Sequence, residues 1–389
     1  MRNPKGCWLI CGAAALALFC TLGLNINAFS VYVPYLTKSL QLTPAQHSAF
    51  MVVRNLFSVT SVYAAKFYYE KLNIKLGFSC ALILSVIAVF LYSSADTFID
   101  LCLAAVVSGI CYGLGGMYPV AILIHRWFPM HEGLAMGICS ASSGLALTIF
   151  APILTALTES YSMRFSMYCE IAFMFICLIV CVCLIRNYPE EGLHFERKVH
   201  VKKAPPKLSW MFFAIVALGT LGGAFSYLTV HYTTEGLDPY QISALISVFG
   251  VTLTLAKFIL GIFLDIWGSY RTNWLFFSLA ILSCIIFSLG AKVGYPIVMF
   301  AACIFGIGDS LPTVGVSAYA RDLSTPENFP AIQQQYQTAN MLGGLVCMVI
   351  PGAIATLTGN YRGFYIIITC LTTFSAIVIQ KTYAKNRRK

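Results

Sequence analysis

Long apolar stretches are the feature that most constrains how this chain folds. Near-continuous hydrophobic runs recur twelve times along 389 residues, and only 10% of the residues are charged. A helix needs about 20 consecutive apolar residues to cross a bilayer, whereas an ordinary globular protein has roughly 25% charged residues. The sequence therefore predicts an all-α membrane protein and excludes a soluble domain.

Twelve transmembrane helices are expected, with short joins between them. The first resembles a signal peptide because Arg2 and Lys5 precede it, but the apolar run is too long and lacks a small-residue cleavage site, so we expect it to be retained. The expected spans are 8–36, 46–69, 76–94, 98–124, 133–157, 165–186, 209–232, 241–264, 273–291, 295–319, 331–357 and 363–381.

Positive charge gathers on one side of the expected membrane. If both termini are cytoplasmic, 19 of the 25 Lys and Arg residues lie on the cytoplasmic side, and only Lys38, Arg164, Lys292 and Arg362 lie outside. Cytoplasmic loops carry such an excess. The pattern predicts a multi-pass protein with both termini in the cytoplasm. It also explains the net charge of +10 by topology and by contact with anionic lipids, rather than by nucleic acid.

Short sequence patterns recur at a constant spacing along the chain. Ala28-Phe29-Ser30 returns as Ala224-Phe225-Ser226, while Glu70 and Arg126 are matched by Asp265 and Arg321 after 195 residues. Two parallel repeats of six helices are a known transporter architecture, with the substrate site near the bilayer midplane between them. The expected division is an N-terminal half at 1–187, a polar cytoplasmic linker at 188–208 and a C-terminal half at 209–389.

The stretch after the fourth expected span resembles a family signature. Residues 126–137 read Arg-Trp-Phe-Pro-Met-His-Glu-Gly-Leu-Ala-Met-Gly. This is similar to the R-W-F-P-x-x-x-G-x-A-x-G motif of the oxalate:formate antiporter family and its monocarboxylate transporter relatives, which have the major facilitator fold of two pseudo-symmetric six-helix halves. The pattern Gly261-x-x-x-Asp265-x-x-Gly268 resembles the facilitator loop motif, which is degraded in the first half. The resemblance implies gating or structural roles for Asp265, Gly261, Gly268, Arg126 and Glu70.

Lys257 is the leading candidate for substrate binding. Relatives usually carry an arginine at this position, eight residues before the motif aspartate, and it contacts the substrate carboxylate. Lys257 lies about 12 Å along the helix from Asp265, and a charge at the centre of a membrane helix costs at least ~2.5 kcal/mol. We therefore expect Lys257 to hold a carboxylate, with a structural ion pair to Asp309 as the alternative.

Three other ionisable residues are expected deep within the spans, away from the span ends. Asp309 is about 18 Å along the helix from Arg321, and we expect it to carry a proton, or else to form a permanent salt bridge to Lys257 or Arg54. Arg54 is a candidate second anion contact or extracellular gate, with a structural pair to Glu170 as the alternative. Glu170 itself is expected near the outer edge in contact with water.

The remaining candidates come from helix faces and from the resemblance. Relatives place an aromatic residue near the substrate at the position of Tyr118, and Asn340 stands where oxalate transporters carry a second cation. Its neutrality favours a monocarboxylate over a dianion. Aromatic residues can enclose the apolar end of such a ligand while a hydroxyl reaches a polar atom. The further cavity candidates are Asn27, Tyr32, Tyr227 and Tyr336.

The sequence thus predicts a proton-coupled secondary transporter of small organic anions, with lactate, pyruvate or formate as the favoured type of cargo, working by alternating access. The alternatives are a proton-independent anion exchanger of the oxalate/formate type and a drug-type exporter. There is no GxxxxGK[ST] nucleotide motif, and no catalytic constellation at a shared depth, so we expect no enzyme.

The cysteines and the loops complete the sequence-based expectations. The 15 cysteines form no CxxC pair and have no His partners at metal-ligand spacing. We expect them to act as small apolar residues, and we expect neither a metal nor a cofactor. We expect a monomer in a cell membrane, and the short loops together with the absence of a targeting segment favour a bacterial inner membrane.

Overall fold

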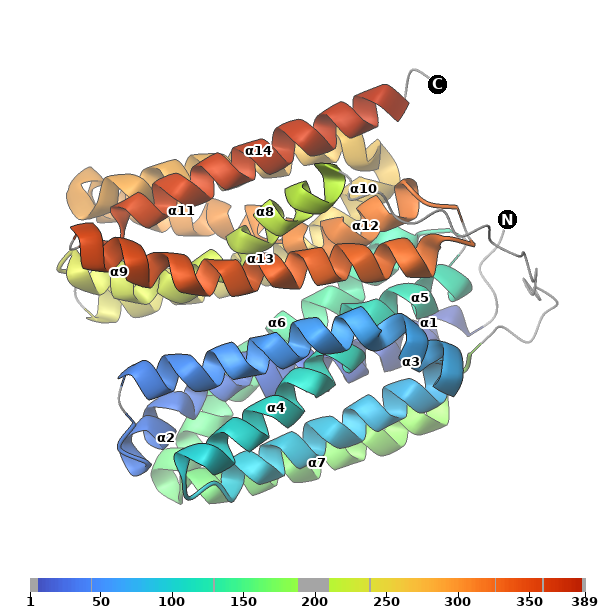
Figure 1. The fold of residues 1–389 in the computed structure, drawn as a ribbon, viewed down its shortest axis with the longest axis horizontal. Helices are drawn as coiled ribbons and strands as arrows, with labels where there is room; N and C mark the ends of the chain where they lie inside the picture. The colour runs from blue at the N-terminus through green and yellow to red at the C-terminus, as the bar shows by residue number, and fades with distance from the viewer. Residues whose placement is uncertain are drawn as a thin grey trace. The chain divides into compact units, whose positions relative to one another are not determined.

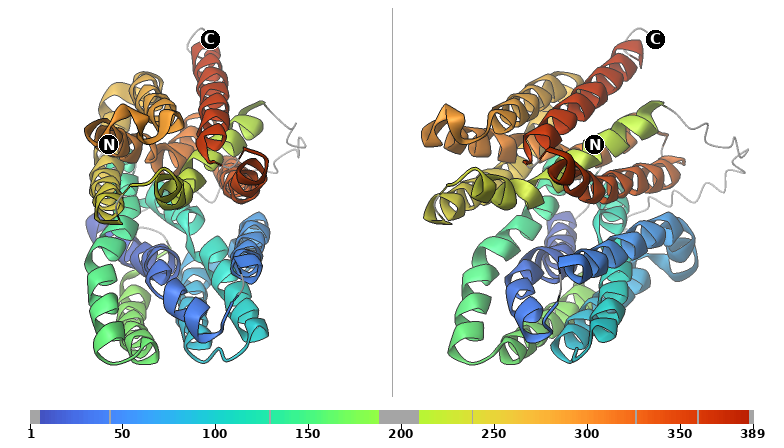
Figure 2. Two further views of the ribbon diagram at one scale, coloured as in Figure 1. Left: turned by 90° about the vertical axis from the view of Figure 1, so that its left-hand side faces the viewer. Right: turned by 60° about the vertical axis from the view of Figure 1, so that its left-hand side comes forward.

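A computed structural model describes residues 6–42, 44–128, 130–187, 210–237, 239–325, 327–358 and 360–386. Every regular element in these ranges is a helix. The chain divides into two compact units, Met1–Lys198 and Val199–Lys389. The expected linker at 188–208 lies outside the described residues. Figures 1 and 2 show that the long helices of each unit run roughly alongside one another.

The first unit contains six segments of membrane-spanning length. The first segment is interrupted by a π-helical and a 3-10 stretch, the second and third form one long helix with a break, and the fourth is broken once. In order, the elements are α1 (Cys7–Leu18), η1 (Phe19–Asn27), η2 (Ala28–Val31), α2 (Val33–Ser39), α3 (Pro44–Ser93), α4 (Phe98–Gly115), α5 (Met117–Trp127), α6 (Glu132–Ser160) and α7 (Met163–Leu184).

The second unit repeats this arrangement. Its elements are α8 (Trp210–Ala224), η3 (Phe225–Tyr227), α9 (Leu228–Thr234), α10 (Pro239–Leu289), η4 (Gly290–Val293), α11 (Tyr295–Gly308), η5 (Leu311–Gly315), α12 (Val316–Asp322), α13 (Phe329–Thr358) and α14 (Arg362–Asn386). Among the described residues, eight helical stretches are long and apolar enough to cross a membrane, and two of these, Ala49–Ser93 and Ala244–Val293, are long enough to hold two spans each. The elements are consistent with the twelve expected spans.

The irregular points of the two units fall at matching positions. Helix α3 breaks at Asn73 (φ 57°, ψ 169°) and α10 breaks at Gly268 (φ 72°, ψ 160°), which is 195 residues later. The repeated Ala-Phe-Ser sequences both overlap a 3-10 turn: the first lies within η2, and the second begins at the last residue of α8 and continues into η3. The sequence repeat therefore has a structural counterpart, in which the same local backbone geometry recurs.

Glycines allow neighbouring helices to pack closely within a unit. A Cβ added to Gly113 of α4 would lie 2.5 Å from the Ser58 carbonyl oxygen of α3, and one added to Gly308 of α11 would lie 2.5 Å from the Cβ of Ala280 in α10. Such small-residue contacts let membrane helices approach each other. The second contact lies directly before Asp309 in the sequence.

Both of the arginines expected outside the membrane pair with carboxylates. An Arg164 Nη2 donates to Asp96 Oδ1 at 2.5 Å. Arg362 binds Glu235 with two nitrogens, and its Nε lies 2.6 Å from Oε1. The Glu235 carboxylate also accepts the Ala291 N–H at 3.3 Å. The second pair therefore joins the end of α9 to η4 and to the start of α14.

Gly268 and Gly250 form a matched pair for a stability test, because a Cβ would meet open space at both positions of α10. The backbone of Gly268 is in a region that other residues rarely adopt, whereas Gly250 lies in regular helix. We expect Gly268→Ala to lower the free energy of unfolding by roughly 1–3 kcal/mol and Gly250→Ala to raise it by up to about 1 kcal/mol. Thermal unfolding in detergent measures both, and a shift of the same sign would contradict the backbone argument.

The Glu235–Arg362 pair predicts a pH-dependent contribution to stability. Hydrogen bonding from Arg362 holds the pKa of Glu235 below its ordinary value. A carboxyl group whose pKa is lowered by folding stabilises the protein above its unfolded pKa, about 4.3, and loses this contribution as the pH falls through the folded pKa. We expect Arg362→Gln to lower the melting temperature at neutral pH, with the difference from wild type shrinking below about pH 4.

The exposed Arg164–Asp96 pair supplies the control for that experiment. Its side chains are 55% and 77% exposed, so water screens their attraction, and such pairs contribute only about 0–1 kcal/mol. Arg164→Gln should therefore change the melting temperature little at any pH. A destabilisation by Arg362→Gln that stayed constant from neutral to acidic pH would rule out the ionic contribution of Glu235.

Candidate functional site

The two residues predicted to hold the substrate and the proton lie in one polar cluster of the second unit. Lys257 is in the first half of α10, and Asp309 follows the last residue of α11. They are 4% and 7% exposed, and their charges interact electrostatically. Packing of α11 against α10 therefore brings together two charged groups that are 52 residues apart in the sequence.

A helix break positions Asp309. Its N–H still bonds to the Phe305 carbonyl at 2.8 Å, but the chain then passes into the π-helical stretch η5, which contains Pro312. Proline has no N–H, so Pro312 cannot donate the next regular α-helical bond to Gly308. In many membrane proteins that bind small solutes, interrupted helices line the binding site.

The Asp309 carboxylate faces a space left by a small residue. Its Oδ1 is buried and has no hydrogen-bond partner within the described ranges, and a Cβ added to Gly222 of α8 would lie 3.8 Å from this oxygen. Cys284 in the second half of α10 and Cys347 of α13 also interact with the Asp309 charge. The sequence did not indicate Gly222, Cys284 and Cys347, which come near Asp309 only after folding.

The other predicted residues of the second unit lie on neighbouring helices. Asn340 of α13 is half-buried and its Oδ1 has no partner among the described residues, whereas its backbone carbonyl packs against Gly219 of α8. Tyr336 is buried on the same helix. The Tyr227 hydroxyl donates to the Met348 carbonyl at 3.0 Å, so this hydroxyl already has a protein partner.

Arg54 of α3 lies in an aromatic environment in the first unit. It is buried, its guanidinium carbon lies 5.8 Å from the centre of the Phe29 ring, and its charge interacts with Tyr92 and Tyr112. Its Nη1 makes no hydrogen bond in the part of the chain that the structure describes, and Arg54 forms no ion pair there. The alternative of a structural pair between Arg54 and Glu170 is therefore wrong.

Glu170 and Tyr32 contact each other instead. Glu170 of α7 is 2% exposed, which corrects the expectation that it meets water, and its Oε2 accepts the Tyr32 hydroxyl at 2.9 Å. The predicted cavity residue Tyr32 thus has its hydroxyl bound within the unit. Asn27 also has a protein partner, because its side chain donates to the Ser143 carbonyl at 3.2 Å. Tyr118 is buried in the first turn of α5 and packs against Tyr69.

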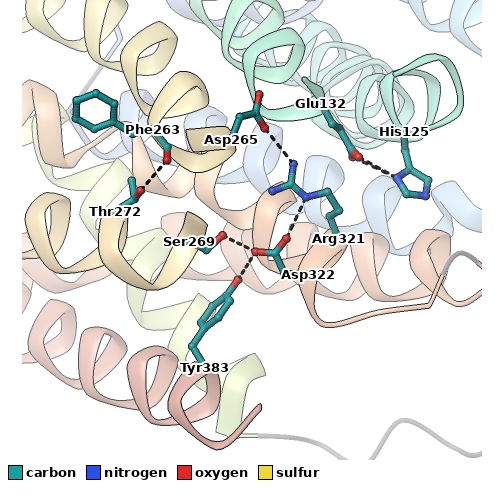
Figure 3. A network of polar contacts seen from close by, with 9 residues as sticks. All are labelled: His125, Glu132, Phe263, Asp265, Ser269, Thr272, Arg321, Asp322 and Tyr383. Carbon is teal, nitrogen blue, oxygen red and sulfur yellow. Dashed lines mark hydrogen bonds and ion pairs between the residues drawn. The ribbon is translucent and has the colours of Figure 1, made fainter. Parts of the chain in front are cut away.

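The predicted loop-motif residues of the second unit belong to a polar network (Figure 3). Asp265 lies 3.8 Å from Arg321 Nη1, and Arg321 Nε donates to Asp322 Oδ1 at 3.0 Å. Asp322 Oδ2 accepts hydrogen bonds from Ser269 and from the Tyr383 hydroxyl. The network joins the middle of α10, next to its break, to the end of α12 and to α14. Gly261 is buried earlier in α10, and Gly268 forms the break next to Ser269.

The corresponding residues of the first unit interact differently. Glu70 pairs with Lys66 at 3.8 Å, one helical turn away, while both Glu70 and Arg126 interact electrostatically with the Tyr118 hydroxyl. His125 Nδ1 lies 3.2 Å from Glu132 (Figure 3). In the first half, where the loop motif is degraded, Glu70 pairs with Lys66 on its own helix, whereas the matching Asp265 of the second half pairs with Arg321.

Three residues of this network, Asp322, Ser269 and Tyr383, were not predicted from the sequence. Only Asp322 could have been. Asp322 directly follows Arg321, so an acidic residue at the end of the tenth expected span was visible. Ser269 and Tyr383 carried no such signal. Within the described ranges, no group of three His, Cys, Asp or Glu side chains is arranged to hold a metal ion.

A multi-pass helical protein of two repeating units, with buried charges beside a helix break, belongs to the class of membrane transporters. The family model described as Major Facilitator Superfamily matches residues 14–328 and 232–389. The chain therefore belongs to the Major Facilitator Superfamily, and it is a transporter rather than an enzyme.

Curated relatives are similar at low identity. Monocarboxylate transporter 12 of Mus musculus is 21% identical over 313 residues, and the match covers 70% of this chain and 64% of the mouse protein. The human protein of the same name is 21% identical, with 96% of this chain and 79% of that protein covered. An MFS-type transporter of Gibberella zeae is 22% identical, with 92% and 83% covered. The narrower resemblance to the oxalate:formate antiporter family stays a prediction.

Solved structures share the fold. The human organic anion transporter MFSD10 (TETRAN) has a TM-score of 0.74 at 12% identity, and the match covers 96% of this chain and 99% of that chain. The proton:xylose symporter XylE has a TM-score of 0.77 at 12% identity, with 98% and 96% covered. At such identity the likeness shows the architecture alone, which is the predicted major facilitator fold.

The electrostatic interaction between the buried groups Lys257 and Asp309 predicts a measurable energetic coupling. Removing one partner of a buried pair leaves the other charge without compensation and costs up to about 3–5 kcal/mol. We expect Lys257→Gln and Asp309→Asn each to destabilise the protein, and the double variant to be more stable than the sum of the two effects predicts, by at least about 1 kcal/mol. The exposed Lys66–Glu70 pair is the control, with an expected coupling below about 0.5 kcal/mol. Additive effects for Lys257 and Asp309 would contradict their interaction.

Proposed function

We propose that this chain is a proton-coupled secondary transporter of small organic anions, with monocarboxylates such as lactate, pyruvate or formate as the favoured class, working by alternating access. The observation that carries the proposal is that two oppositely charged side chains, Lys257 and Asp309, are both buried and interact electrostatically beside the break after α11. A cation supplies a counter-charge for a carboxylate, and the neighbouring acid can bind a proton.

The charge balance of this pair suggests how substrate and proton are linked. Without substrate, the Asp309 carboxylate balances the Lys257 ammonium. A substrate carboxylate that binds Lys257 adds a second negative charge to a site from which water is largely excluded, and uncompensated buried charge is costly. Uptake of one proton from water by Asp309 restores the balance. One anion and one proton would then move together, and the loaded site would have the same net charge as the empty one.

A monocarboxylate fits this cluster better than a dianion. Lys257 is a compact cation with three donors and lacks the two-pronged geometry of arginine. Asn340 is neutral at the place where the resemblance implies a second cation, so it can bind a polar group of the substrate without balancing another charge. The names of the mammalian relatives point to the same class of substrate. We further propose Arg54 as a second anion contact and Tyr118, Tyr227 and Tyr336 as ring surfaces around the substrate.

A second candidate function keeps the anion and omits the proton. The proximity of Asp309 to Lys257 also suits a permanent ion pair, and a protein with such a pair would exchange one organic anion for another, as in oxalate/formate exchange. This alternative predicts stimulation of uptake by internal substrate and little dependence on pH. The Asp309→Asn variant distinguishes the two, because it removes a proton carrier in one case and only a structural partner in the other.

The membrane setting completes the proposal. The protein is a multi-pass membrane protein, and the distribution of Lys and Arg supports an orientation with both termini in the cytoplasm. We propose a monomer that contacts anionic lipids on that side. The bacterial inner membrane is predicted from sequence features of the loops and termini, whereas the curated relatives reported above come from eukaryotes.

Ligand-dependent stability and uptake test the proposal together. A ligand that binds only the folded protein stabilises it, by about 2.7 kcal/mol at a concentration of 100 times Kd. We expect lactate, pyruvate or formate to raise the melting temperature of the wild type in detergent and to have no effect on Lys257→Gln. In liposomes, we expect wild-type uptake to be faster with an inward proton gradient, and Asp309→Asn to lose this pH dependence.

Lys292→Gln serves as the matched control, because this lysine is exposed outside the expected spans, and it should retain both responses. Stabilisation by oxalate but by none of the monocarboxylates would favour the exchanger. If Asp309→Asn kept the full pH dependence of uptake, the assignment of the proton to Asp309 would be wrong.

A further inference from the structure

A second buried carboxyl group lies in the first unit, apart from the residues of the proposed transport site. Glu170 lies near the first third of α7 and is almost completely buried. Within residues 6–187 as described, no Lys or Arg forms an ion pair with it. Its one hydrogen bond in these ranges comes from the Tyr32 hydroxyl, 2.9 Å from Oε2. Glu170 therefore resembles Asp309 in burial but lacks a neighbouring cation.

Tyr32 connects Glu170 to a chain of hydroxyl groups. The Tyr32 hydroxyl also lies 3.1 Å from Ser166 Oγ, which is one turn before Glu170 on α7. Ser166 Oγ in turn lies 3.1 Å from the Leu154 carbonyl oxygen of α6, to which it can donate. The chain thus runs from Glu170 through Tyr32 and Ser166 to a backbone acceptor, and it joins the first membrane segment, α6 and α7.

These hydrogen-bonded groups can satisfy both the ionised and the protonated form of Glu170. When Glu170 is ionised, Tyr32 donates its single hydrogen to the carboxylate, and Ser166 donates to Tyr32 or to Leu154. When Glu170 is protonated, it donates to Tyr32, Tyr32 donates to Ser166, and Ser166 donates to Leu154. Every hydroxyl hydrogen has an acceptor in both states. The direction of the chain reverses, and no group is left unsatisfied.

We infer that Glu170, Tyr32 and Ser166 form a proton-binding site in the first unit, separate from the Lys257–Asp309 pair of the second unit. The bound proton comes from water and adds to a carboxylate oxygen of Glu170, and no other bond is made or broken. A buried charge without a cationic partner is costly, and proton binding removes it. In the protonated state, the Leu154 carbonyl accepts the hydrogen of Ser166, so every donor in the hydroxyl chain has an acceptor.

The groups around Glu170 are consistent with this assignment. Cys20 of η1 interacts with the Glu170 charge, and Cys169 of α7 interacts with Tyr32. Phe29 packs against Tyr32 with ring centres 6.5 Å apart, and its ring also lies beneath Arg54 of α3 and 4.2 Å from the Tyr92 ring. The Phe29 ring therefore contacts both Tyr32 of the Glu170 cluster and Arg54. Arg164, the arginine at the start of α7, pairs with Asp96.

Infrared difference spectroscopy of the purified full-length protein tests the site without any substrate. Spectra recorded between alkaline and acidic pH should contain the C=O band of a protonated carboxyl group that disappears in Glu170→Gln. The same band should persist in Asp309→Asn, because that acid belongs to the other unit. It should also persist in Glu159→Gln, an exposed glutamate at the end of α6 that serves as the matched control.

If Glu170→Gln does not fold, variants of the two hydroxyl residues, Tyr32 and Ser166, still test the assignment. Tyr32→Phe removes the hydrogen bond to the acid, so we expect the band to move to higher frequency and its midpoint pH to change. Ser166→Ala should produce a smaller change of the same kind. A spectrum in which Glu170→Gln removes no band, or in which Tyr32→Phe leaves the band unchanged, would overturn the assignment. Because no carboxylate ligand is used, this failure would leave the proposed transport function unaffected.

Discussion

A bilayer offers no water to buried polar groups, and the rest of this structure follows from that constraint. Backbone groups in a membrane must be satisfied within the protein, which favours continuous helices. A break such as the one after α11 is therefore costly unless the released backbone groups find other partners or line a water-filled cavity. Here it places the unpartnered Oδ1 of Asp309 opposite Gly222, beside Lys257.

The same constraint accounts for the way charges are arranged in the two units. In the second unit the acid and the base lie together, so that each compensates the other. In the first unit Arg54 lies among aromatic rings, while Glu170 is bound by the Tyr32 hydroxyl. The two related halves thus stabilise their buried charges by different interactions. In the first unit the buried cation Arg54 and the buried acid Glu170 do not pair with each other, so each can bind a different partner.

Much of the fold could be predicted because membrane spans and repeats are local or periodic properties of a sequence. The spans follow from apolar length, and the breaks at Asn73 and Gly268 coincide with the degraded and intact copies of one motif. The contacts of Glu170 could not be predicted, because depth estimated along one helix does not reveal what a neighbouring helix covers. For the same reason, Cys284 and Cys347 gave no signal of their proximity to Asp309.

The sequence by itself determined that the chain is a helical membrane protein with two repeats and with ionisable residues at depth, because hydropathy and spacing require no knowledge of packing. Only the tertiary structure decided which of these residues meet. It brought Lys257 to Asp309, kept Arg54 from Glu170 and joined Glu170 to Tyr32 and Ser166, because such pairings depend on how α6, α7, α10 and α11 pack within their own units.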